Sequence, residues 1–105
     1  MMPNARFSGR AKQNLLSIGV YTLRTWGKRQ TARYLDDLER CAKMLARNPK
    51  IGRSCDWIRP GLHRFEQGRH VVFYRREEDG ILVVRILHQS MSPDRHSFKD
   101  VTPDA

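Results

Sequence analysis

The sequence predicts one α+β domain with the element order β-α-α-β-β-β, in which a helical hairpin packs on one face of a small antiparallel sheet. Two amphipathic helical patterns meet at a glycine in the first half of the 105-residue chain. Three strand-like runs separated by turn signals fill the second half. A chain of this length suits a single domain over residues 1–105, with a core at about 5–98 and a polar tail from Ser92 that holds one short turn.

The helical hairpin follows from two apolar stripes with helical spacing. Ser8 or Gly9 is expected to lead into the first helix, and Trp26-Gly27 separates the two helices because glycine suits the residue just past a helix end. Asn48-Pro49 ends the second helix, since a residue before proline is disfavoured in the α region. The stripes comprise Ala11, Leu15, Ile18 and Trp26 in the first helix, and Tyr34, Leu38, Cys41 and Leu45 in the second.

The sheet is expected from a short strand at residues 5–8 and three later runs. These runs cover Leu62–Gln67, His70–Arg76 and Ile81–His88, and Asp79-Gly80 is a strong hairpin signal between the last two. With a turn of two or four residues, one face carries Val71, Phe73, Leu82, Val84 and Ile86, and we expect this face to lie beneath the helices.

The other face would then carry Arg85 near Tyr74 and would be more open. A three-residue turn would exchange the two faces, because a shift of one residue reverses every side chain of a strand.

Charge and cysteine content limit the classes of function. The chain has 20 Lys and Arg against 11 Asp and Glu, a net charge of +9, which indicates an acidic partner such as nucleic acid, an anionic membrane or an acidic protein. The basic residues before "LLSIGVYTL" imitate a signal peptide, but Ser17 and Gly19 interrupt the apolar run, and we reject secretion. No run approaches the roughly 20 apolar residues of a membrane span. Cys41 and Cys55 fit neither a disulfide framework nor a zinc ribbon. We expect Cys41 to be a core residue. Because no disulfide is expected, the predicted compartment is the reducing cytoplasm.

The last strand, "GILVVRILHQS", carries the clearest candidate polar residues. Arg85 could bind a phosphate with its guanidinium fork, and His88 could transfer a proton. Alternatively, Arg85 pairs with an acidic group such as Glu66 or extends to water. Trp26 and Tyr34 are expected to pack between the helices. The four histidines lack metal-ligand spacing, and no cofactor motif is present, so we predict no metal and no cofactor.

Taken in order along the chain, several short motifs are specific. They are "Y-x4-WG-x2-Q-x3-Y-x3-L" at Tyr21–Leu38, "NP-x-x-GR" at Asn48–Arg53, "GLHRF", "HVVFYR" and "VVRILHQSM". Over residues 5–98 the chain resembles the ParE toxins of the RelE/ParE superfamily. The resemblance implies a toxin of a type II toxin–antitoxin system that inhibits DNA gyrase and is neutralised by a ParD-like antitoxin, whose C-terminal segment wraps the toxin. Operator DNA would be reached only through the antitoxin.

Two alternatives remain open. The first is a RelE-type ribosome-dependent mRNA nuclease, for which Arg85 matches the strand arginine and Arg64 or Arg75 another arginine. Against it, no tyrosine follows Tyr74 and the lysine pair typical of the central region is absent, so we predict no catalytic residue, with His88 as the point left open. The second is a non-enzymatic nucleic-acid-binding module, although the basic residues are spread over both helices.

The expected contacts with an antitoxin or target lie on the helical hairpin and on the open sheet face. They are Trp26, Tyr34, Leu38, Arg64, Tyr74 and Arg85.

Overall fold

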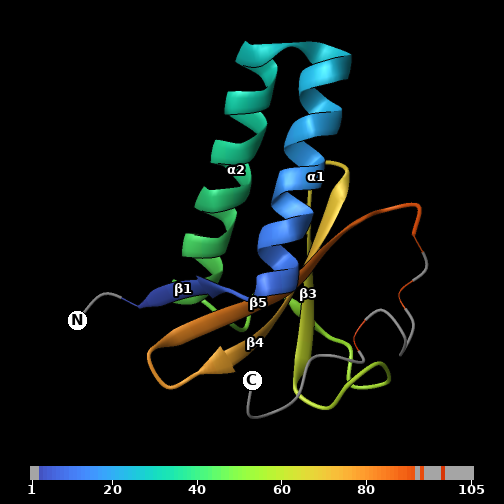
Figure 1. The fold of residues 1–105 in the computed structure, drawn as a ribbon. Coiled ribbons are helices and arrows are strands. Elements are labelled where there is room, and N and C mark those ends of the chain that lie inside the picture. Colours follow the sequence, from blue (N-terminus) through green and yellow to red (C-terminus); the bar gives the residue numbers. More distant parts are fainter. Residues whose placement is uncertain (1–2, 92, 94–97, 99–105) are drawn as a thin grey trace.

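A helical hairpin lies on one face of a five-stranded sheet (Figure 1). The computed structural model describes residues 3–91, 93 and 98. The sheet order is β1-β5-β4-β3-β2, with β1 parallel to β5 and the other neighbours antiparallel. The α+β prediction is therefore confirmed, and the sheet is mixed rather than purely antiparallel. The elements are β1 (Asn4–Phe7), α1 (Gly9–Trp26), α2 (Lys28–Arg47), β2 (Arg53–Ser54), β3 (Leu62–Gln67), β4 (His70–Glu77) and β5 (Gly80–His88).

Both helices begin and end where capping chemistry predicts. The Ser8 side chain accepts a hydrogen bond from the Ala11 N–H at 3.0 Å, which satisfies one of the free donors at the start of α1. Gly27 separates the helices with φ of 87°, a left-handed conformation that favours glycine. Asn48 ends α2 directly before Pro49.

The helices cover the opposite sheet face from the one expected. Tyr74 and Val83 pack beneath the helices with Val72, Ile81 and Ile86. Val71, Phe73, Leu82 and Val84, which were expected there, lie on the other face, where the loop before β3 and Phe98 cover them. The prediction was wrong because both faces of β4 and β5 are apolar, so alternation along the strands does not tell which face the helices bury.

A β-bulge in β5 explains the position of Ile86. The turn between β4 and β5 has two residues, because Glu77 pairs with Gly80. The pairing then shifts from Tyr74 with Val83 to Phe73 with Arg85, which leaves one additional residue in β5. After the bulge, each β5 side chain lies on the opposite face from the one that strict alternation would give it. Ile86 therefore lies in the core beneath the helices.

The two cysteines are buried free thiols, as expected for Cys41. Burial raises the pKa of each thiol to about 11, so neither forms a reactive thiolate near neutral pH. No helix in the described ranges is long and apolar enough to cross a membrane. The turn expected in the tail falls outside the described residues. Phe98, which is described, is fully buried, with its ring edge-on to Phe73 at 4.9 Å.

Candidate functional site

A groove of about 480 Å³ lies between α1 and the end of β5. It brings together the two polar residues of the last strand, Arg85 and His88. Its lining combines apolar and polar side chains. The lining residues are Asn14, Ser17, Ile18, Tyr21, His70, Arg85, Ile86, Leu87, His88 and Met91.

Arg85 contacts α1 through the Asn14 side chain. Its Nε donates to the Asn14 side-chain oxygen at 3.1 Å, and the Ile86 N–H donates to the same oxygen at 3.0 Å. The Asn14 amide thus caps the edge of β5 beyond the end of β1. Burial, followed by the nearby charge of Arg10, lowers the pKa of the Arg85 guanidinium. The expected partner, Glu66, instead contacts Arg53 and Arg64.

A short hydrogen bond joins α2 to β4 behind this groove. The Tyr34 hydroxyl accepts the Arg69 N–H at 3.1 Å and lies 2.5 Å from His70 Nδ1. The Tyr34 hydroxyl thus joins the β3–β4 turn and the His70 ring to α2. Burial, and secondarily the neighbouring His88 ring at 5.3 Å, lowers the pKa of His70 to about 4.

One ring nitrogen of His88, Nδ1, is engaged within the strand end. His88 Nδ1 accepts the Ser90 N–H at 3.1 Å and lies 2.7 Å from the Ser90 hydroxyl. The polar atoms of Arg85 and His88 therefore hold backbone and neighbouring side chains in place. Within the described part of the chain, no group of three His, Cys, Asp or Glu residues could hold a metal ion. This arrangement suits a binding groove better than a catalytic pair.

The outer side of α1 is an open apolar surface next to the groove. Leu16, Val20 and Leu23 repeat at spacings of four and three residues, and Leu16 is 71% exposed. Tyr21 and Trp26 are exposed on the same helix. Trp26 was expected between the helices, and this was wrong, because it lies at the tip of the hairpin, away from the sheet (Figure 1). We call Leu16, Val20, Tyr21 and Leu23 the α1 apolar surface.

The six residues predicted to contact a partner do not form one surface. Leu38 is 2% exposed and Tyr74 is fully buried, so neither side chain reaches a partner in this fold. Tyr34 and Arg85 are partly buried near the groove. Trp26 lies at the hairpin tip, and Arg64 lies on the opposite sheet face, over the Phe73 ring.

Tyr74 is instead a structural residue of the core. Its hydroxyl donates to the Pro49 carbonyl at 2.7 Å and accepts the Gly52 N–H at 3.0 Å. The expectation that Arg85 lies near Tyr74 on an open face was therefore wrong. The α1 apolar surface was missed, although apolar residues on more than one side of the first helix were a sign of it.

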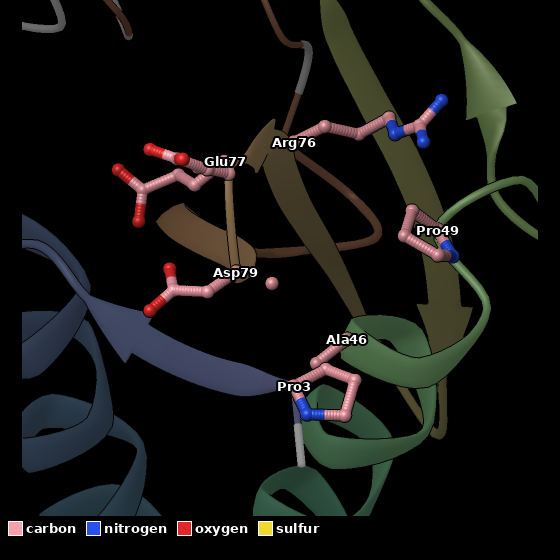
Figure 2. A pocket seen from close by; sticks show the side chains of 8 residues that line it. Pro3, Ala46, Pro49, Arg76, Glu77 and Asp79 are labelled. Atoms are coloured by element: carbon pink, nitrogen blue, oxygen red, sulfur yellow. The ribbon is translucent and has the colours of Figure 1, made fainter. Parts of the chain in front are cut away.

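A second hollow, of about 670 Å³, lies at the β4–β5 turn between Pro3, Ala46 and Pro49 (Figure 2). Glu77 and Asp79 extend to one side of it, while Arg76 points away from them. Glu77 forms an ion pair with Arg6 at 2.7 Å, which holds the pKa of Glu77 below its ordinary value. No predicted site residue lies in this hollow.

Comparison with known proteins agrees with the fold and the motif order. The model of the ParE toxin family, the toxin of the parDE type II toxin–antitoxin system, matches residues 5–93. The chain belongs to the ParE toxin family. It is therefore the toxin component of a type II toxin–antitoxin system, as the motifs implied.

Two relatives of this ParE toxin come from bacteria. The chain is 42% identical to "Toxin ParE1" of Mycobacterium tuberculosis over 87 residues, which is 82% of this chain and 89% of that protein. It is 39% identical to "Toxin ParE1" of Caulobacter vibrioides over 94 residues, covering 87% and 94% of the two chains. A solved structure of the chromosomal ParDE TA system from P. aeruginosa shares the fold, with a TM-score of 0.69, 18% identity, and coverage of 83% of this chain and 96% of that chain.

Proposed function

We propose that this ParE toxin inhibits DNA gyrase as a binding protein, without catalysing a reaction of its own, and that a ParD-like antitoxin neutralises it. Membership of the ParE family is the observation that carries the proposal. In this proposal the toxin acts in the cytoplasm, where Cys41 and Cys55 remain thiols.

The antitoxin is proposed to cover the α1 apolar surface and the groove beside it. Large exposed side chains on one helix are unfavourable in water and mark protein contact sites in small proteins. An amphipathic segment of the antitoxin could place apolar residues against Leu16 and Val20 and an acidic residue near Arg85. The net charge of +9 favours a partner segment with negative charges. The shared fold with a chain of the P. aeruginosa ParDE system supports a ParD-like partner.

The absence of catalysis is proposed from the state of the candidate catalytic groups. A nuclease of this superfamily needs a free acid or base beside its arginines. His88 Nδ1 is engaged by Ser90 and the Arg85 Nε by Asn14. No tyrosine follows Tyr74 in the sequence. These features favour inhibition by binding over cleavage of RNA.

The test is a gyrase supercoiling assay with ATP and relaxed plasmid. The purified toxin should reduce supercoiling and increase the linear DNA recovered after denaturing gyrase. A parallel primer extension on translated mRNA should show no new ends. Undisturbed supercoiling at saturating toxin would refute the gyrase target, and toxin-dependent mRNA ends would favour the nuclease.

The antitoxin surface is tested separately in cells that express the toxin with the antitoxin from its neighbouring gene. Leu16→Glu with Val20→Glu should prevent rescue of growth, because buried carboxylates without partners would oppose docking. Gln30→Glu with Ala32→Glu, which adds the same charge at exposed positions of α2, is the matched control. Equal rescue of both double variants would place the antitoxin elsewhere.

A further inference from the structure

Three arginines gather on the sheet face that the helices leave uncovered. Arg53 of β2 pairs directly with Arg64 of β3, so the two side chains are cross-strand neighbours. Like charges in this position repel each other unless an anion lies between them. The Glu66 carboxylate lies 3.0 Å from Arg53 and 3.7 Å from Arg64, so two guanidinium groups share one carboxylate as their ion-pair partner. Arg59 adds a third positive charge from the loop before β3.

Two of these arginines are already held in place. The Arg64 guanidinium carbon lies 5.8 Å from the centroid of the Phe73 ring, and Arg59 Nη2 donates to the Phe98 carbonyl at 3.0 Å. The Nε atoms of Arg59 and Arg64 are buried and have no hydrogen-bond partner among the described residues. These guanidinium groups have thus lost water without gaining a full set of acceptors.

An oxyanion at their terminal nitrogens would find ordered, partly dehydrated donors, and binding would require little further ordering. The Arg64 side chain remains 25% exposed, so it is accessible to such a group.

The loop between β2 and β3 contains a tryptophan, Trp57, which lies between Arg53 and Arg59 in the sequence. Cys55 and Ile58 anchor the loop in the second core, and the Asp56 carboxylate accepts the Gly61 N–H at 2.8 Å. Trp57 lies between the two anchors, yet it is 64% exposed. A large aromatic side chain held outward by an ordered loop is typical of a contact residue rather than of a core residue.

We propose that this surface, consisting of Arg53, Trp57, Arg59 and Arg64, binds a single-stranded nucleic acid segment. The guanidinium forks suit phosphate oxygens, and the Trp57 ring suits stacking on an unpaired base. A phosphodiester chain carries one charge per nucleotide and can reach several arginines while Glu66 keeps its own pairing. Within the described stretch from residue 53 to residue 67, the carboxylates Asp56 and Glu66 are fewer than the three arginines. The proposal goes beyond gyrase inhibition and does not depend on it.

The experiment measures the binding of a fluorescent oligothymidine of about 12 nucleotides by anisotropy, over a range of salt concentrations. Each lost phosphate contact should reduce the slope of log affinity against log salt by about 0.7, so Arg53→Gln with Arg59→Gln should reduce it by about 1.4. Trp57→Ala should weaken binding roughly 5- to 150-fold. The matched control is Arg29→Gln with Arg33→Gln on α2, which removes the same charge from exposed positions and should retain the wild-type slope.

Tryptophan fluorescence gives a second readout that does not rely on the arginine variants folding normally. The chain has two tryptophans, so Trp26→Phe leaves Trp57 as the reporter and Trp57→Phe leaves Trp26. Oligothymidine should quench the first variant and not the second. Three results would overturn the proposal: no binding at low salt, the same loss of slope in the α2 control, or quenching of Trp26 alone.

Displacement of oligothymidine by polyglutamate of equal charge, as effectively as by unlabelled oligothymidine, would also overturn it and would indicate an acidic protein partner. No gyrase is present in these measurements, so their outcome is separate from that of the supercoiling assay.

Discussion

Acidification from pH 6.5 to 4.5 should destabilise this toxin through one histidine. In the folded chain His70 Nδ1 is hydrogen-bonded to the Tyr34 hydroxyl, and burial, followed by His88, lowers the pKa of His70 from 6.5 to about 4. In the unfolded chain the ring titrates near 6.5. Between these values the unfolded state binds more protons than the folded state, so the free energy of unfolding decreases as the pH falls.

The magnitude follows from the pKa change. One pKa unit corresponds to about 1.4 kcal/mol, so the full change from 6.5 to about 4 corresponds to about 3 kcal/mol. His70 remains partly in contact with solvent, which screens the cost of charging it, and we expect a loss of about 1–2 kcal/mol. Glu77, whose pKa is held down by Arg6, loses its contribution only below its ordinary value of 4.5. The two effects therefore occupy different pH ranges.

The assay is urea unfolding followed by circular dichroism at pH 6.5, 5.5 and 4.5 for the wild type and His70→Gln. The variant should lose most of the decrease in unfolding free energy that the wild type shows. His63→Gln, which removes a histidine outside the Tyr34 contact, should retain it. A wild-type decrease that persists unchanged in His70→Gln would refute the reasoning, as would an NMR titration that places the midpoint of folded His70 near 6.5.

Three further predictions concern stability in urea at neutral pH. Tyr74→Phe should cost about 1–3 kcal/mol, because it leaves a carbonyl and an N–H of the loop after α2 without their partner, and a cost below 0.5 kcal/mol would contradict that role. Phe98→Ala should cost about 3–5 kcal/mol through the cavity left beside the second core, whereas an unchanged denaturation midpoint would show that the core does not need this side chain. Gly80→Ala should disrupt the β1–β5 pairing, since a Cβ would lie 1.8 Å from the Asn4 carbonyl oxygen at φ of 151°, and hydrogen exchange in β1 as slow as in the wild type would count against it.

The proposed antitoxin and nucleic acid surfaces lie on different sides of the molecule. The α1 apolar surface belongs to the helical hairpin, while Arg53, Arg59 and Arg64 lie on the far face of the sheet or in the loop that covers it. A toxin bound by its antitoxin along α1 could therefore keep its arginines accessible. The oligothymidine measurement can be repeated on the toxin–antitoxin complex to examine this.

The sequence by itself determined both helices, four of the five strands described here and their order, while the two-residue strand β2 in the expected loop was missed. Ser8, Gly27 and Asn48-Pro49 act through local backbone chemistry, so they placed the helix ends correctly. The bounds of β3 were also correct, because the turn residues around it are local signals. The order of short motifs along the chain was sufficient to indicate the ParE family, which the family model confirmed.

Only the tertiary structure decided which side chains meet. Both faces of β4 and β5 are apolar, so the choice of the face beneath the helices depends on packing between distant elements. The bulge in β5 moved Ile86 to the other face, and Arg85 contacts Asn14, a residue of α1 that is far away in sequence. No local pattern marks either feature. Tyr74 is buried for the same reason, since its partners lie in a loop more than 20 residues away in sequence. Local propensity fixes where a strand begins and ends, whereas burial depends on what packs against it.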